Sequence, residues 1–191
     1  LFVATSLTPA FSAYAQPAPN ASAALPAGSA MAEGEVPMDI PPEVLEKIRQ
    51  IESIDWKHGP TTGDLNHATI NVPAGAMFAD GAGTRKYLEL NHNPTNGDEL
   101  GMVVAEDHSW FVIFDFSDIG YVKDDEKDEI DADAILKSLR EGTEEANKIR
   151  RQRGWDAVTV VGWASNPRYE PTTHNLEWAT KLRNDKTRDE S

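Results

Sequence analysis

The sequence contains no cysteine among its 191 residues. Disulfide bonds, thiolate metal ligands and a cysteine nucleophile are therefore excluded. No uninterrupted apolar run reaches the ~18–20 residues that a membrane-spanning helix needs. The HExxH, GxSxG, Walker and GxGxxG motifs are also missing, so no zinc-peptidase, α/β-hydrolase or nucleotide-binding signature is present and no cofactor is expected.

Basic residues are scarce relative to acidic ones. There are 18 Lys and Arg residues against 32 Asp and Glu residues, which gives a formal net charge of -14. Because nucleic acid is also negative and no basic stripe is present, nucleic acid is not an expected partner. The segment 98–133 alone holds 13 acidic and 2 basic residues. We expect it to form a solvated acidic surface.

The N-terminal residues have the pattern of the second half of a signal peptide. An apolar stretch is followed by Ala13-Tyr14-Ala15, which puts small residues at the -3 and -1 positions of a cleavage site after Ala15. The following segment is rich in Ala, Pro, Ser and Gly, which is typical of a disordered tether. The predicted organisation is a partial signal peptide (1–15), a linker (16–38), one extracytoplasmic domain that is truncated (39–183) and a polar tail (184–191).

The rest of the chain alternates between helical and strand patterns. A helix is expected from Pro41-Pro42, a short one near Thr84 to Leu90, and a longer one capped by Asp131 or Asp133. Strands are expected at 68–72, 100–105, 110–116, 158–163 and 175–182. This order predicts an α+β fold, with a mixed, mainly antiparallel sheet and two or three packing helices.

The strand 110–116 is apolar on both faces, which predicts a central position in the sheet. We expect Trp110, Phe114 and Leu139 to share one core. Leu139 belongs to the predicted buried stripe of the third helix, which also contains Ile135, Gly142, Ala146 and Ile149. The basic residues near the end of this helix suit its dipole and need no ligand to explain them: Lys148, Arg150, Arg151 and Arg153.

The acidic run 124–133 is a candidate for calcium binding, since it carries seven carboxylates in ten residues. It lacks the glycine at the sixth position and the closing glutamate of a calcium-binding loop. A solvated lead-in to the helix is the favoured interpretation, and a weak divalent-cation site remains an alternative. No metal ligand is assigned.

His174 lies near Ser165 and Glu170 in the sequence, which supplies the residue types of a Ser/His/acid set. Such sets are recognised by geometry and not by proximity in sequence, and Ser165 has no nucleophile elbow. No catalytic residue is assigned. A hydrolase acting on an envelope polymer remains an alternative.

The segment Gly162 to Trp178 is the predicted binding region. The two predicted strands are joined by a nine-residue connection, Ala164 to Thr172, which is longer than a plain hairpin needs. Long connections on a rigid scaffold often carry binding residues. The candidates combine hydrogen-bonding, titratable and aromatic groups: Trp163, Arg168, Tyr169, Glu170, His174 and Trp178.

Several ordered strings resemble a known family. They include Gly59-Pro60-Thr61-Thr62, Trp110-Phe111-Val112 and Leu139-Arg140-Glu141-Gly142-Thr143, and the similarity runs from about Gly59 to Leu182. Together they resemble an uncharacterised bacterial family of predicted membrane-anchored proteins built around a domain of unknown function. The resemblance implies a signal peptide, an extracytoplasmic domain and a C-terminal membrane segment, which this sequence would lack as a fragment. It implies no activity and no catalytic residue.

The expected function is therefore a non-enzymatic, extracytoplasmic and membrane-associated binding or scaffold domain of the bacterial envelope. Its expected partners are the membrane, in the full-length form, and an envelope protein or polymer.

Overall fold

The structure of this protein is a computed structural model that describes residues 2–6, 11–17, 40–118 and 123–188. The predicted linker lies almost entirely outside the described residues. Three helices and ten strands occur in the described part: β1 (Phe2–Ser6), β2 (Phe11–Pro17), α1 (Pro42–Glu52), β3 (Lys57–His58), β4 (Thr61–Asp64), β5 (Thr69–Val72), β6 (Ala76–Asp80), α2 (Gly81–Leu90), β7 (Glu99–Ala105), β8 (Trp110–Phe116), α3 (Ala132–Gln152), β9 (Val158–Glu170) and β10 (Asn175–Asn184).

The strands form one large sheet and one separate hairpin. The eight-stranded sheet has the order β3-β6-β7-β8-β2-β1-β10-β9, and β4 pairs with β5 outside it. Each strand pair is antiparallel. The α+β prediction is confirmed, and the sheet is antiparallel where we expected a mixed one.

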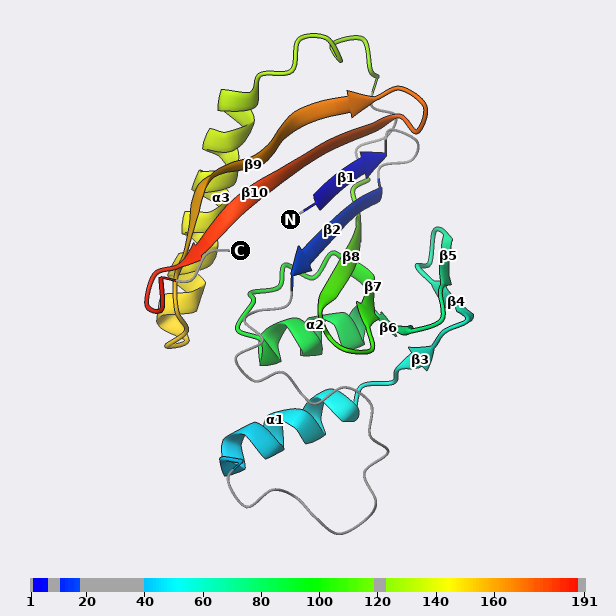
Figure 1. The fold of residues 1–191 in the computed structure, drawn as a ribbon, viewed down its shortest axis with the longest axis vertical. Coiled ribbons are helices and arrows are strands. Elements are labelled where there is room, and N and C mark those ends of the chain that lie inside the picture. Colours follow the sequence, from blue (N-terminus) through cyan, green and yellow to red (C-terminus); the bar gives the residue numbers. More distant parts are fainter. Residues whose placement is uncertain (1, 7–10, 18–39, 119–122, 189–191) are drawn as a thin grey trace.

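Strands β1 and β2 lie between β8 and β10, so they join the two parts of the large sheet (Figure 1). β2 pairs with β8 from Phe11↔Phe116 to Pro17↔Trp110, and β1 pairs with β10 from Val3↔Trp178 to Ser6↔Asn175. These two strands are formed largely by residues of the predicted signal peptide, 1–15. Cleavage after Ala15 stays a prediction, and it would remove β1 and most of β2.

Strand β8 is internal and covered on both faces, as its sequence predicted. On one face, Phe111 and Ile113 belong to a buried cluster with residues of the neighbouring strands and of α2. Its other members are Ile54, Ala79, Tyr87, Leu88, Met102 and Val104. On the other face, Phe114 packs against a cluster formed with the β4–β5 hairpin: Leu65, Val72, Ala76, Phe78 and Val103. Alternation of side chains along the strand thus separates two cores.

The prediction of one core containing Trp110, Phe114 and Leu139 is wrong. Trp110 is 41% exposed, because it opens β8 beside the turn at 106–109. Phe114 is partly buried against the hairpin cluster. Leu139 is only partly covered on α3 and belongs to neither core cluster.

Helix α3 packs along β9 through polar groups. The Asn147 side chain donates from Nδ2 to the Val158 carbonyl at 2.8 Å and accepts from the Val158 N–H at 3.0 Å. Arg140 donates to the carbonyls of Val160 and Val161 at 3.3 and 3.0 Å. These bonds occupy backbone groups at the free edge of the sheet, which would otherwise invite strand addition.

This arrangement explains why the predicted buried stripe of α3 is not deeply buried. Asn147 is the buried residue of the helix, while Gly142 is exposed and Ile149 is 38% exposed. The helix begins as predicted, because the Asp131 side chain accepts hydrogen bonds from the N–H groups of Asp133 and Ala134.

The long connection predicted between the last two strands is not a loop. β9 continues to Glu170 and β10 begins at Asn175, so residues 171–174 form the turn. Register shifts between Glu177 and Leu182 let the irregular segment remain paired. Residues 164–170 are thus part of a long hairpin, and the predicted nine-residue connection is not present.

Candidate functional site

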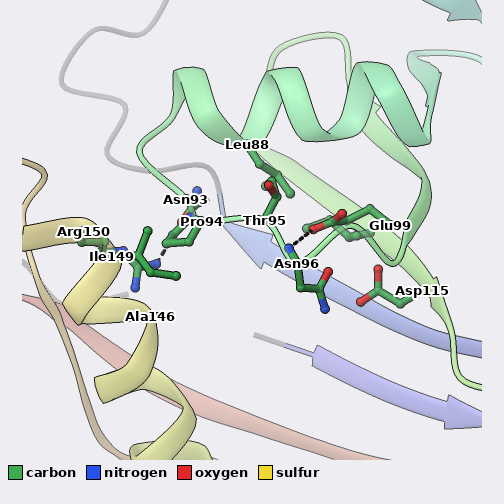
Figure 2. Close-up of a pocket in the computed structure, with 11 residues that line it drawn as sticks. Leu88, Asn93, Pro94, Thr95, Asn96, Glu99, Asp115, Ala146, Ile149 and Arg150 are labelled. Atoms are coloured by element: carbon green, nitrogen blue, oxygen red, sulfur yellow. Dashed lines mark hydrogen bonds between the residues drawn. The ribbon is translucent and has the colours of Figure 1, made fainter. Parts of the chain in front are cut away.

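A cavity of about 350 Å³ lies between α3 and the helix-covered face of the β7–β8 ladder. Its walls come from β7 and β8, from the segment that follows α2, and from the C-terminal half of α3 (Figure 2). A volume of this size is at the lower end of small-molecule sites. The lining combines apolar and polar side chains: Leu88, Asn93, Pro94, Thr95, Asn96, Glu99, Ile113, Asp115, Ala146, Ile149 and Arg150.

Glu99 forms part of the cavity floor and is 6% exposed. Its two carboxylate oxygens accept hydrogen bonds from the backbone N–H groups of Asn96 and Gly97, both at 3.1 Å. Arg85 Nη1 lies 3.9 Å from Glu99 Oε2 and donates to the Glu99 carbonyl at 3.1 Å. The Glu99 carboxylate is therefore satisfied from within the protein.

Asp115 lies directly opposite Glu99 on β8, and both side chains reach the cavity. The Asp115 carboxyl has no hydrogen bond and no cationic partner among the described residues, and its Oδ1 atom is buried. Burial, together with the nearby negative charges of Glu99 and Asp98, raises the pKa of Asp115 to about 6. At neutral pH this is a negative group without compensation.

Arg150 approaches the cavity from α3, on the side away from Asp115 (Figure 2). Its guanidinium donates to the side-chain oxygens of Asn93 at 3.3 Å and Asn147 at 3.4 Å. Burial lowers the pKa of Arg150, and no carboxylate among the described residues pairs with it. A guanidinium has five N–H donors, so three remain for a ligand or for water.

Arg150 differs in this respect from its basic neighbours. Arg151 pairs with Glu144, Lys148 with Glu145 at 2.6 Å, and Arg153 with Glu89 at 3.3 Å. The helix dipole accounted for all four basic residues in the sequence, but it does not explain why only this one faces a cavity without a counterion.

The C-terminal ends of α2 and α3 are connected beside the cavity by an ion pair and by ring contacts. Arg153 pairs with Glu89 and lies 4.8 Å from the centre of the Trp155 ring, and His92 stacks on the same ring at 5.2 Å. Burial and the charge of Lys47 lower the pKa of His92, which favours its neutral form. These contacts set the spacing of the two helices and therefore the width of the cavity.

The six residues predicted as a binding site are divided between two faces of the β9–β10 hairpin. Arg168 lies opposite Glu177, and they form an ion pair at 2.7 Å on one face. Leu176, Trp178 and Thr180 alternate along β10 and share the other face. Tyr169 lies opposite Leu176 and Trp163 lies opposite Thr180, so both belong to that face with Trp178. Glu170 accepts a hydrogen bond from the Thr172 hydroxyl at 2.7 Å. These six residues therefore do not form one surface.

Part of the predicted set does come together at the turn. The Tyr169 hydroxyl donates to Asp124 Oδ2 at 2.6 Å and lies 2.8 Å from His174 Nδ1. This hydrogen bond from Tyr169 lowers the pKa of Asp124. The cluster ties the acidic segment before α3 to the tip of the hairpin.

Ser165 is not part of this cluster. It lies opposite Ala179, whereas the turn containing His174 immediately precedes Asn175. Four residues along a strand correspond to roughly 13 Å. Ser165 is therefore separated in space from the turn that carries His174, and the Ser/His/acid set does not form.

The acidic run 124–133 is divided among local roles. Asp124 bonds to Tyr169 and Asp131 caps α3. In the part of the chain that the structure describes, no three His, Asp or Glu side chains converge in an arrangement that could hold a metal ion.

The cavity was missed in the sequence, although one signal pointed to it. Asp115 interrupts an otherwise apolar strand between Phe114 and Phe116, and an acidic residue there must reach solvent, a partner or a cavity. Arg150 gave no comparable signal, because its neighbours have the same charge.

The fold and the cavity define a small α+β protein with a polar cleft at a helix–sheet boundary. Residues 57–191 match a family described as a protein of unknown function, DUF2167. The match covers well over half of the chain, which therefore belongs to this family. No curated protein and no solved structure matches the chain. None of the helices in the described ranges is long and apolar enough to cross a membrane.

Proposed function

We propose that this protein is an extracytoplasmic, membrane-associated binding domain of the bacterial envelope, and that the cavity between α3 and the β7–β8 ladder is its ligand site. The observation that carries the proposal is that two side chains without an oppositely charged partner among the described residues, Asp115 and Arg150, line the same cavity from opposite sides. Half-buried charges without partners are costly in a folded protein unless a ligand or ordered water compensates them.

The envelope location is supported by the pattern of the first 15 residues and by the family resemblance. The absence of cysteine is compatible with an oxidising compartment, since no thiol needs protection there. The expected partners are an envelope protein or polymer and, from the family resemblance, the membrane.

A binding role is favoured over catalysis by the composition of the cavity. Among the described residues its lining contains no histidine, cysteine or serine, and the hydroxyl group of Thr95 has no neighbouring base there. Glu99 is held by two backbone N–H groups, which leaves Asp115 as the one free carboxyl. One carboxyl can orient a ligand, whereas hydrolysis by carboxylates uses a pair with separate roles.

Methyl NMR spectroscopy tests the ligand site directly. Ile113 and Ile149 line the cavity, and Ile54 in the helix core serves as an internal control. A panel of small envelope constituents should shift the two cavity methyl signals and leave the Ile54 signal in place. If no compound in a panel that includes anionic, cationic, zwitterionic and neutral polar molecules moves them, the cavity is not a ligand site.

The location is tested separately by expressing the full-length gene in a bacterial host. The N-terminus of the exported form should begin at Gln16. A form that keeps its first 15 residues in the cytoplasmic fraction contradicts the envelope assignment without bearing on the cavity.

A further inference from the structure

We propose that the cavity between α3 and the β7–β8 ladder binds a zwitterion of the amino-acid or short-peptide class, with its carboxylate at Arg150 and its ammonium group at Asp115. This inference rests on the proposed ligand site and specifies its ligand chemistry.

The two charges have a definite polarity. Arg150 stands on the α3 wall, and Asp115 stands on β8 at the opposite side, with Pro94, Thr95 and Asn96 between them (Figure 2). A ligand with a single charge could neutralise only Arg150 or only Asp115. A ligand with a carboxylate at one end and an ammonium group at the other neutralises both at once.

The Arg150 end is suited to a carboxylate. Asn93 and Asn147 each accept one hydrogen bond from the guanidinium, and this fixes its orientation without reducing its charge. Planar guanidinium groups bind carboxylates through two parallel hydrogen bonds. Since the basic neighbours on α3 are already paired, the free donors of Arg150 are the ones available to the cavity.

The Asp115 end is suited to an ammonium group. Its carboxyl accepts no hydrogen bond from the described residues, and Glu99 directly opposite adds a second negative charge. Two adjacent carboxylates attract a positively charged ligand group more strongly than they attract a neutral hydroxyl group of a ligand. Glu99 is held by backbone N–H groups and Arg85, so the Asp115 carboxyl is the one that can turn toward a ligand.

The space between the charged ends suits a short peptide backbone. The Asn96 amide and the Thr95 hydroxyl are polar, whereas Pro94, Ile113, Ala146 and Ile149 are apolar. Few polar groups among apolar walls are typical of sites that orient small ligands. Peptides with free ends therefore match the site at both ends and along its length.

The test uses glycine, diglycine, triglycine and tetraglycine, each compared with its N-acetylated and its C-amidated form. Binding is followed by the Ile113 and Ile149 methyl signals of the full chain at pH 7.5 and low salt. We expect one length to bind best, because only that length spans both charges. Blocking either end of that peptide should weaken binding about ten- to hundredfold, as expected for loss of a charge-assisted hydrogen bond.

Two substitutions separate the two ends. Asp115→Asn should abolish the preference for a free amine while the preference for a free carboxylate persists, and Arg150→Gln should do the reverse. Asp118→Asn and Arg151→Gln are matched controls with the same charge changes at exposed positions, and they should leave both preferences unchanged. An unshifted Ile54 signal verifies that each variant is folded, and Arg150→Lys keeps the positive charge if the glutamine variant unfolds.

The outcomes distinguish this inference from the proposed function. If blocked and free peptides bind equally, or only amines or only carboxylates bind, the zwitterion assignment is overturned while the ligand site stands. If the free peptides bind but Asp115→Asn and Arg150→Gln leave both preferences intact, the assignment of the two ends is overturned. If no compound of any charge class moves the cavity methyl signals, both proposals fall.

Discussion

Glu99 on β7 and Asp115 on β8 lie directly opposite each other, so the sheet places two carboxyl groups side by side at the base of a cavity. Like charges in opposite positions of an antiparallel ladder destabilise it. Hydrogen bonds within the protein stabilise the Glu99 carboxylate, whereas the Asp115 carboxyl has no hydrogen-bond partner among the described residues. Asn96 and Gly97 donate to Glu99, while Asp115 takes on a raised pKa of about 6.

The first prediction concerns stability as a function of pH. The pKa of Asp115 is about 6 in the folded protein and 3.8 for an unperturbed aspartate, so the folded state binds more protons between these values. Well below its unperturbed pKa of 3.8 the carboxyl is neutral in both states, and its cost to folding is absent. The cost appears as the pH rises from 4 to 6 and is complete above 6.

Asp115→Asn should therefore stabilise the protein above pH 6 by about 1 kcal/mol, a figure reduced to allow for screening by solvent at a partly exposed site. The advantage should disappear near pH 4. Thermal melts of both proteins from pH 4 to pH 8 measure this difference. An advantage that is constant over the whole range contradicts the ionisation argument, and Asp118→Asn is the control for the loss of one exposed charge.

The second prediction concerns the contact between α3 and β9. Replacing Asn147 by Ala removes its two hydrogen bonds to the Val158 backbone, which leaves that N–H and carbonyl without partners, and it also removes its longer bonds with Glu144 and Arg150. We expect a loss of about 1–3 kcal/mol in the free energy of unfolding. Denaturant melts measure the loss, with Glu145→Ala on the exposed side of α3 as the control. Equal stability of the two variants would show that water replaces Asn147 at no cost.

The third prediction uses two helical glycines in contrasting surroundings. A Cβ atom at Gly81 would overlap the Glu99 carbonyl oxygen, because α2 begins in close contact with β7. At Gly142 on α3 a Cβ atom meets nothing within 4 Å. Gly81→Ala should lower stability by about 1–3 kcal/mol through overpacking. Gly142→Ala should raise it by about 0.5–1 kcal/mol through helix propensity.

Thermal or denaturant melts of the two glycine variants are compared directly, since they make the same chemical change. A Gly81→Ala variant as stable as the wild type would mean that α2 can move away from Glu99. In that case the cavity floor is less rigid than the close contact implies.

The fourth prediction concerns the first strands. A chain that begins at Gln16 lacks β1 and most of β2, which leaves the backbone groups of β8 and β10 that they pair with unpaired. Unpaired edges of apolar strands tend to add further strands. We expect faster amide hydrogen exchange at 110–116 and 175–178 in this form, or self-association that restores protection at higher protein concentration.

The control region for the exchange experiment is β6–β7, which does not pair with the N-terminal strands. Unchanged protection at β8 and β10 in a monomeric shortened chain would show that the N-terminal strands do not protect these edges. Slower exchange only at high concentration would identify strand addition between copies.

The sequence alone determined the α+β class, because helical and strand periods are local properties of hydrophobic spacing. It placed β8 at its observed bounds, since a strand with apolar residues on both faces has to be covered on both sides. It also placed the start of α3, because Asp131 acts through nearby backbone N–H groups. The family followed from ordered strings of residues, which do not depend on contacts.

Only the tertiary structure decided which residues form the cavity. Glu99, Asp115 and Arg150 come from separate elements, and their proximity depends on strand register and on how α3 lies against the sheet. The same reason explains the wrong predictions. Trp110 and Leu139 have core-like periodicity, but whether a face is covered depends on elements distant in sequence. Local patterns fix the faces of strands and helices, and packing alone decides which of them meet.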